Sequence, residues 1–269
     1  MDSTRTAWNL SALEFTVLWH AIGRDVLPYP LRYRSVEETA AAYEHAYKTA
    51  AARLRTVFDE DLYGPLRILV QPEARIEVAG FAGAARSVLP RAEADAAAQV
   101  RMHAAVAGRG AVLVTQDSTA ETDRGGHVRI AFVSAHTLTR RVLAAFPDVP
   151  RGSGPEIRMD RAEIDAPADR PFTAFFDDTA PPARDAAHRF FERPRSTVAH
   201  IAVYPGGAYD HRPAAARDFH IMDYPDGRYR VRATATVHAI PTDTAELSAH
   251  LNSLLERTLS DYREDHERF

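Results

Sequence analysis

Histidine is the residue type in this chain that most suggests a chemical function. The sequence holds 12 histidines and no cysteine. Metal-binding histidines usually recur at His-x-His or His-Glu-x-x-His spacing, or together with cysteines. No pair of histidines here has either spacing. His103, His200, His220 and His238 lie in strand-like runs, where partly exposed or hydrogen-bonded histidines are common, so we predict no metal site.

The short motifs of common catalytic sites are also missing. No Gly-x-Ser-x-Gly elbow, Walker loop or Gly-x-Gly-x-x-Gly fingerprint follows a strand-like run. The cluster Asp59-Glu60-Asp61 lacks the alternating oxygen ligands and the glycine of a calcium loop, and it is typical of a solvated helix end. We predict no catalytic residue and no cofactor. The alternative is a small-molecule-binding or hydrolytic enzyme that uses scattered histidines and carboxylates in a cleft.

Composition narrows the classes of partner. The 33 basic and 37 acidic residues give a net charge of −4, which argues against a nucleic-acid binder. No apolar run reaches the roughly 20 residues that span a bilayer. Residues 1–9 lack the basic and apolar parts of a signal peptide. We therefore expect a cytoplasmic protein that binds neither nucleic acid nor membrane.

Capping boxes, in which a Ser or Thr and a Glu three residues later cap each other's amides, mark the first helices. Ser11-Ala-Leu-Glu14 precedes an apolar stripe at helical spacing. A second box, Ser35-Val-Glu-Glu38, predicts the start of a longer alanine-rich helix. Further helices are expected at 138–146, at about 182–193 and after Asp243.

Between these helices the pattern changes to the two-residue period of strands. The strand-like runs are 75–81, 99–107, 111–116, 127–133, 197–204, 218–224 and 228–240. Short turns such as Gly108-Arg-Gly110 join most of them, which favours an antiparallel sheet with helices to one side or at its ends. Both halves of the chain end in the same order of expected elements, which is a turn, a strand, a helix cap and a helix.

We therefore predict the α+β class, with a central, mostly antiparallel sheet. The chain is expected to form a single pseudo-symmetric domain over 1–269, with an N-terminal half at 1–149 and a C-terminal half at 155–269. The proline- and glycine-rich segment from Pro150 to Pro155 is the expected linker between the halves.

Two segments have no obvious place in this regular pattern. Five aromatic residues either fill core beneath a helical cap or line a groove for a hydrophobic partner. They are Phe172, Phe175, Phe176, Phe190 and Phe191. The stretch from Gly83 to Ala98 is long for a connection between strands, and such insertions are usually functional or disordered.

Taken in order, several segments resemble the EspG-type secretion-associated proteins of actinobacterial type VII (ESX) systems. Residues 13–23, followed by Leu27-Pro-Tyr-Pro-Leu31, are similar to the opening helix of that family and its Pro-x-Pro-Leu exit. Residues 74–81 are similar to its first long strand. Asp226-Gly-Arg-Tyr229, a strand, a proline and a helix near Asp243 are similar to its closing unit. The resemblance covers nearly the whole chain.

The resemblance implies a fold and a function. The family fold has a central, largely antiparallel sheet, two helical bundles and an internal pseudo-two-fold. The family function is that of a cytosolic chaperone without enzymatic activity, which binds the hydrophobic tip of a PPE protein in a PE–PPE heterodimer. It thereby keeps the pair soluble and directs it to its secretion system.

The same resemblance indicates where the partner would bind. In the family, the groove lies between the sheet and the C-terminal helical bundle, with a contribution from a loop between early strands. By order along the chain, these regions correspond to 156–191, to the strands from Thr197 onward and to the 83–98 loop. The expected partner-binding residues are Val88, Leu89, Phe172, Phe175 and Phe176.

One departure from the family pattern is expected. Family members often carry an extra hairpin before the last strand, whereas the run 228–240 reads as one uninterrupted strand. We therefore expect this hairpin to be missing or shortened. A homodimer, in which the groove is filled by a second copy of the chain when no partner is present, is a further alternative.

Overall fold

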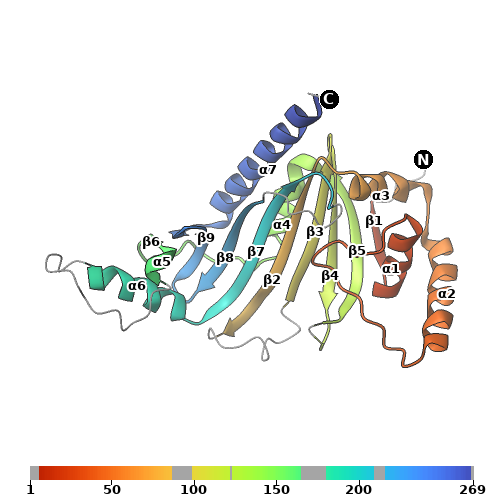
Figure 1. The fold of residues 1–269 in the computed structure, drawn as a ribbon, viewed down its shortest axis with the longest axis horizontal. Helices are drawn as coiled ribbons and strands as arrows, with labels where there is room; N and C mark the ends of the chain where they lie inside the picture. Colours follow the sequence, from red (N-terminus) through yellow and green to blue (C-terminus); the bar gives the residue numbers. More distant parts are fainter. Residues whose placement is uncertain (1–5, 87–98, 122, 165–179, 209–215, 268–269) are drawn as a thin grey trace.

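The computed structural model describes residues 6–86, 99–121, 123–164, 180–208 and 216–267. Its central feature is a ten-stranded sheet in which all neighbouring strands run antiparallel (Figure 1). The strands are β1 (Ala7–Leu10), β2 (Ala74–Arg86), β3 (Gln99–Ala107), β4 (Gly110–Ser118), β5 (Gly125–Ser134), β6 (Ile157–Asp160), β7 (Arg195–Pro205), β8 (Arg217–Tyr224), β9 (Gly227–Ala233) and β10 (Thr236–Pro241). The expected α+β class with an antiparallel sheet is confirmed.

The order of strands in the sheet is β1-β5-β4-β3-β2-β7-β8-β9-β10-β6. In the first half of the chain, β2 to β5 pair consecutively and β1 pairs with β5 at the edge. The second half repeats this order, because β7 to β10 pair consecutively and β6 pairs with β10 at the other edge. The two halves meet at the centre, where β2 pairs with β7 from Ala74 opposite Pro205 to Ala82 opposite Thr197.

Helices gather at both ends of the sheet and across its middle (Figure 1). They are α1 (Ala12–Ala21), α2 (Ala40–Val57), α3 (Tyr63–Val70), α4 (Leu138–Leu143), α5 (Arg161–Ile164), α6 (Ala180–Glu192) and α7 (Thr244–Glu267). In Figure 1, α1, α2 and α3 lie at one end of the long axis and α5 and α6 at the other.

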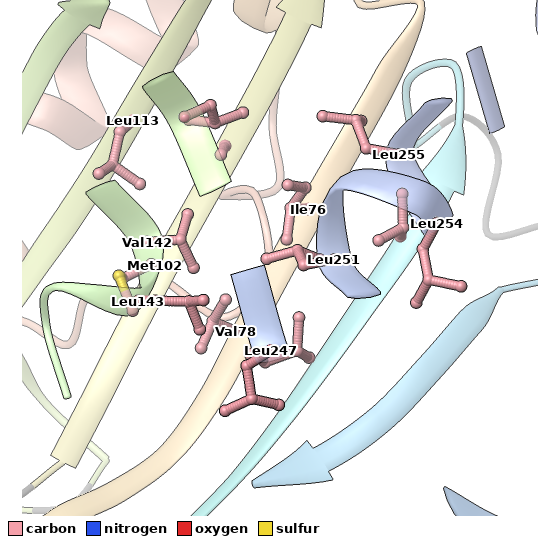
Figure 2. Packing of buried hydrophobic residues seen from close by; sticks show 14 of the residues in the cluster. Ile76, Val78, Met102, Leu113, Val142, Leu143, Leu247, Leu251, Leu254 and Leu255 are labelled. Carbon is pink, nitrogen blue, oxygen red and sulfur yellow. The ribbon is translucent and has the colours of Figure 1, made fainter. Parts of the chain in front are cut away.

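One face of the central strands is covered by α7 and α4. Figure 2 shows Leu247 and Leu251 of α7, with Val142 of α4, directed toward strand residues such as Ile76 and Val78. All five side chains are almost fully buried. Leucines at this helical spacing place one apolar stripe against the flat side of the sheet, as the sequence predicts for the last helix.

Two smaller clusters lie on the opposite face. Helices α1, α2 and α3 pack over the N-terminal half, where Trp8 and Phe15 meet strand residues such as Val112 and Ile130. At the other end, Phe190 of α6 packs with β8, β9 and β10. The assignment of faces follows from strand register, because residues directly opposite each other on paired strands share a face.

The predicted helix starts have different outcomes. Ser11 and Glu14 form the expected capping box, with the Glu14 amide donating to Ser11 Oγ over 3.1 Å and the Ser11 amide to Glu14 Oε2 over 2.7 Å. The second predicted box is wrong. Ser35 Oγ accepts from the Glu37 amide in a local turn, and α2 begins only after Thr39, whose hydroxyl accepts from the Ala42 amide. A short-range side-chain bond has replaced the helical cap at Ser35.

The prediction of one uninterrupted strand over 228–240 is also wrong. The run divides into β9 and β10, which pair antiparallel with Ala233 opposite Val237. Thr234 and Ala235 connect the two strands, so the last hairpin is present and short. The connection contains none of the Gly, Asn or Asp residues that usually mark a tight hairpin, and the sequence therefore gave no turn signal.

Gly80 is needed where the two halves meet. A Cβ atom added there would lie 2.1 Å from the carbonyl oxygen of Val198 and 2.5 Å from the Cα of Ala199, both backbone atoms of β7. We expect Gly80→Ala to lower the free energy of unfolding by about 1–3 kcal/mol, because β2 and β7 must separate to admit the methyl group. Urea denaturation would measure this.

The matched control for that variant is Gly64→Ala. An added Cβ at Gly64 in α3 would meet nothing within 4 Å. Alanine at an exposed helical position should leave stability unchanged or raise it by up to ~1 kcal/mol. Equal unfolding free energies for the two variants would contradict the assigned role of Gly80.

Candidate functional site

The two sides of β7 and β8 differ sharply in exposure. Ala199, Ile201 and Val203 on β7 face α7 and are fully buried, and so is Ile221 on β8. The intervening residues point the other way, and all of them except the buried Ala202 are partly exposed. These residues, with two neighbours on β2, define what we call the open face: Ala79, Phe81, Val198, His200, Tyr204, Asp218, His220 and Met222.

The centre of the open face carries a polar cluster of two histidines and a carboxylate. His200 on β7 lies opposite His220 on β8, with ring centroids 4.7 Å apart. His200 Nε2 lies 3.0 Å from Asp218 Oδ2. Burial lowers the pKa of His220, and the adjacent His200 lowers it further, whereas Asp218 opposes the shift. His220 is therefore neutral at pH 7.

A buried ion pair borders this cluster on β2. Arg75 Nε donates to Glu77 Oε1 over 2.8 Å, and both side chains are about nine-tenths buried. The Arg75 guanidinium also lies over the Tyr204 ring, 4.3 Å from its centroid, which is a favourable cation–π geometry. The cation–π contact holds Arg75 against Tyr204, and the open face combines aromatic, aliphatic and polar groups.

Beyond Glu77, the same side of the sheet is closed by His103 and the chain around Tyr29. His103 on β3 lies directly opposite Glu77, and its Nδ1 donates to the Tyr29 carbonyl oxygen over 2.9 Å. Burial is the main reason that the pKa of His103 falls to about 4, and the charge of Arg75 contributes. The imidazole is therefore a neutral structural donor, while Tyr29 itself is 53% exposed.

At the other side, the open face ends against α6. Phe190 packs against Tyr224 and Tyr229 at centroid distances of 4.7 and 4.9 Å. The Arg193 guanidinium lies 4.3 Å from the Tyr224 centroid and 2.9 Å from Asp226 Oδ1. Burial raises the pKa of Tyr224 to about 12, so this phenol stays protonated. The last turn of α6 is thus fixed firmly to the sheet.

The five predicted partner-binding residues lie outside the described residues. Val88 and Leu89 fall in 87–98, and Phe172, Phe175 and Phe176 fall in 165–179. Their flanking elements are described. The end of β2 pairs with the start of β7, with Arg86 opposite Arg195, and β7 follows α6 by two residues. The chain therefore enters the 87–98 segment next to the C-terminal end of α6.

Of the aromatic group singled out in the sequence, the structure describes two members. Phe190 is buried in the cluster beneath α6, and Phe191 packs partly against it. The core interpretation is confirmed for Phe190, whereas Phe191 stays partly exposed at the edge of the cluster.

Sequence reasoning missed the cluster of His200, Asp218 and His220. The signal was present in the alternation of both runs, since a histidine between buried aliphatic residues must point to the opposite face of its strand. The register that places β7 and β8 side by side could not be read from the sequence.

Within the described residues, no group of three His, Cys, Asp or Glu side chains could hold a metal ion. Among the described helices, none combines the length and the hydrophobicity that a membrane span requires.

Comparison with known proteins identifies the family. A family model described as the EspG family matches residues 11–253. The chain belongs to the EspG family. This is a non-enzymatic family, so the prediction of a non-enzyme is confirmed and the alternative of a hydrolytic enzyme is overturned. A search of curated proteins gave no match.

A solved structure shows the same fold. The chain is similar to the Mycobacterium tuberculosis type VII secretion system chaperone EspG5, solved in complex with the PE25–PPE41 dimer. The TM-score is 0.57, and the match covers 93% of this EspG-family chain and 96% of EspG5. Sequence identity is only 10%, so this likeness establishes the shared fold.

Proposed function

We propose that this chain is a cytosolic chaperone that binds a PE–PPE heterodimer through the hydrophobic tip of its PPE protein. It would keep the pair soluble and direct it to a type VII secretion system. The observation that carries the proposal is membership of the EspG family over residues 11–253. The fold shared with EspG5, which was solved bound to PE25–PPE41, supports it.

The proposed docking site combines the open face with α6. The resemblance places the family groove between the sheet and the C-terminal helical bundle, and these are the elements that border the open face here. An apolar helical tip is prone to aggregate until a groove covers it. Phe81, Val198 and Met222 offer apolar contacts, and the His200–Asp218 pair offers hydrogen bonds that fix the orientation of the tip.

The finer features of the fold also belong to this proposal. We infer that the repeated strand order reflects a pseudo-two-fold, with α1 to α3 as one helical bundle and the elements around α6 as the other. We further infer a single domain over 1–269, because β2 and β7 join the halves within one sheet. Val88, Leu89, Phe172, Phe175 and Phe176 remain the proposed partner contacts from the two adjoining segments.

Co-expression with each PE–PPE pair of the source genome tests the proposal. Size-exclusion chromatography with light scattering should give a mass for one chaperone plus one heterodimer with a cognate pair. The free protein should elute as a monomer or homodimer. If the protein binds none of the soluble pairs, the proposed function is overturned, while the family assignment stays intact.

Variants locate the site within that experiment. Phe175→Asp and Leu89→Asp are expected to abolish complex formation, and Val198→Asp should weaken it strongly, because each places a charge in an apolar contact. The matched control is Val36→Asp, since Val36 is 64% exposed in the segment before α2. Unchanged binding by all three test variants would place the partner elsewhere.

A further inference from the structure

The side of the sheet that faces away from α6 carries a row of basic side chains on its last strands, β9, β10 and β6. His238 on β10 lies directly opposite Arg232 on β9 and Arg158 on β6. Arg230 precedes Arg232 by two residues and points the same way. We call Arg158, Arg230, Arg232 and His238 the arginine face.

The arginine face is on the same side of the sheet as α7. Arg230 lies opposite Ile221, which belongs to the core beneath α7, and its Nη1 is 2.7 Å from both ring nitrogens of His250 on that helix. The alternate residues Val231 and Val237 are buried on the other side, in the cluster beneath α6. The arginine face and the open face therefore lie on opposite sides of the sheet.

The three arginines of this face differ from their neighbours in lacking acidic partners. Arg151, Arg193 and Arg228 form ion pairs with Glu246, Asp226 and Asp223, respectively. No carboxylate oxygen of the described residues forms an ion pair with Arg158, Arg230 or Arg232. Arg158 and Arg232 are exposed, and Arg230 is half-buried.

The arginines of this face act on the pKa of a neighbouring histidine and of one another. Burial is the main reason that the pKa of His250 falls to about 4, and Arg230, Arg257 and Arg232 lower it further. Burial also lowers the pKa of Arg230, with a contribution from Arg232, whereas the charges of Glu246 and Glu156 oppose the shift. Clustered positive charge that has no carboxylate partner attracts an anionic group.

We propose that the arginine face binds an acidic segment of a second protein, through two or more Asp or Glu carboxylates. The planar guanidinium fork matches a carboxylate with two parallel hydrogen bonds. The face is small, and three carboxylates border it: Glu156, which contacts His238, Asp160, which accepts from Thr236, and Glu246, which pairs with Arg151. Because these acids repel other negative groups, a short acidic segment suits this face better than an extended polyanion.

This inference does not depend on the proposed cargo. If both proposals hold, a PE–PPE pair on the open face and an acidic segment on the arginine face can be bound at the same time. The chaperone would then connect its cargo to another protein, with the sheet between them.

The test uses the full-length protein and a fluorescein-labelled hexaglutamate peptide, followed by fluorescence anisotropy at low and at moderate salt. Binding should be detectable at low salt and should weaken as salt screens the charges. The variant Arg158→Gln/Arg232→Gln should bind the peptide about tenfold more weakly. The two residues are exposed, so this variant is expected to fold, and Arg230→Gln is added separately because Arg230 is half-buried.

The control variant is Arg140→Gln/Arg141→Gln, which removes the same charge from exposed positions on α4. Equal loss in both double variants would show a general charge effect and overturn the proposal. Absence of peptide binding at low salt would also overturn it. So would tighter binding to a ten-nucleotide single-stranded DNA or to phosphatidylserine-containing vesicles than to the peptide. Binding of a cognate PE–PPE pair should be the same in wild type and in Arg158→Gln/Arg232→Gln.

Discussion

Replacing Arg228 with alanine is expected to lower the free energy of unfolding by about 3–5 kcal/mol, because it leaves the buried carboxylate of Asp223 without a partner. Arg228 Nε and Nη2 bind Asp223 Oδ1 and Oδ2 at 2.6 and 2.9 Å. The two side chains are 1% and 0% exposed. Nη2 also donates to the Pro147 carbonyl oxygen over 2.7 Å, and Nη1 lies 3.3 Å from Thr244 Oγ1.

The Arg228 contacts join the β8–β9 hairpin to the end of the α4 region and to the start of α7. Chemical denaturation of Arg228→Ala measures the loss, and Arg232→Ala on the same strand is the matched control because Arg232 is exposed. The control should change stability by less than ~0.5 kcal/mol.

A double variant separates the cost of an unpaired charge from the value of the pair itself. Asp223→Leu/Arg228→Met replaces both ions with apolar side chains and should be more stable than Arg228→Ala. A loss below ~1 kcal/mol for Arg228→Ala would show that water reaches Asp223, contrary to its burial in the structure.

Acid should destabilise the protein through His103. The pKa of this side chain is about 4 in the folded protein and about 6.5 when exposed, so between these values the unfolded chain binds the proton more tightly. The contribution of the neutral His103 side chain to the free energy of unfolding is fully present above pH 6.5 and is lost as the pH falls toward 4. This difference in pKa between the folded and the unfolded chain corresponds to about 3 kcal/mol of unfolding free energy. Urea denaturation at a series of pH values from 7 to 4 measures the slope.

The matched comparison for that slope is His103→Gln, which can still donate to the Tyr29 carbonyl oxygen but does not titrate. It should be clearly less sensitive to acid than wild type, whereas His45→Gln should behave as wild type because His45 is exposed on α2. Parallel stability curves for His103→Gln and wild type would show that His103 is not the acid-sensitive group.

Much of the fold could be predicted from local patterns. The two-residue alternation of 218–224 and the leucine spacing after Asp243 each identify one element and its buried side, because both are set by the immediate neighbours in the chain. The pattern failed where a local bond competed with the expected one, as at Ser35, and where a turn lacked its usual residues, as at Thr234 and Ala235.

The linker predicted at 150–155 shows a different limit. The structure fixes this segment against β9, since the Arg228 amide donates to the Pro150 carbonyl oxygen and the Gly152 amide donates to that of Arg228. Such contacts depend on residues more than 70 positions away, which no local pattern reports. The cluster of His200, Asp218 and His220 was missed for the same reason, because it depends on the pairing of β7 with β8.

The ends of the sheet have a consequence for solubility. Within the described residues, the two outermost strands of the sheet are β1 and β6, each of four residues. Short edge strands are poor templates for the addition of further chains. A protein proposed to shield an aggregation-prone cargo would thus be protected from polymerising edge to edge with other copies of itself.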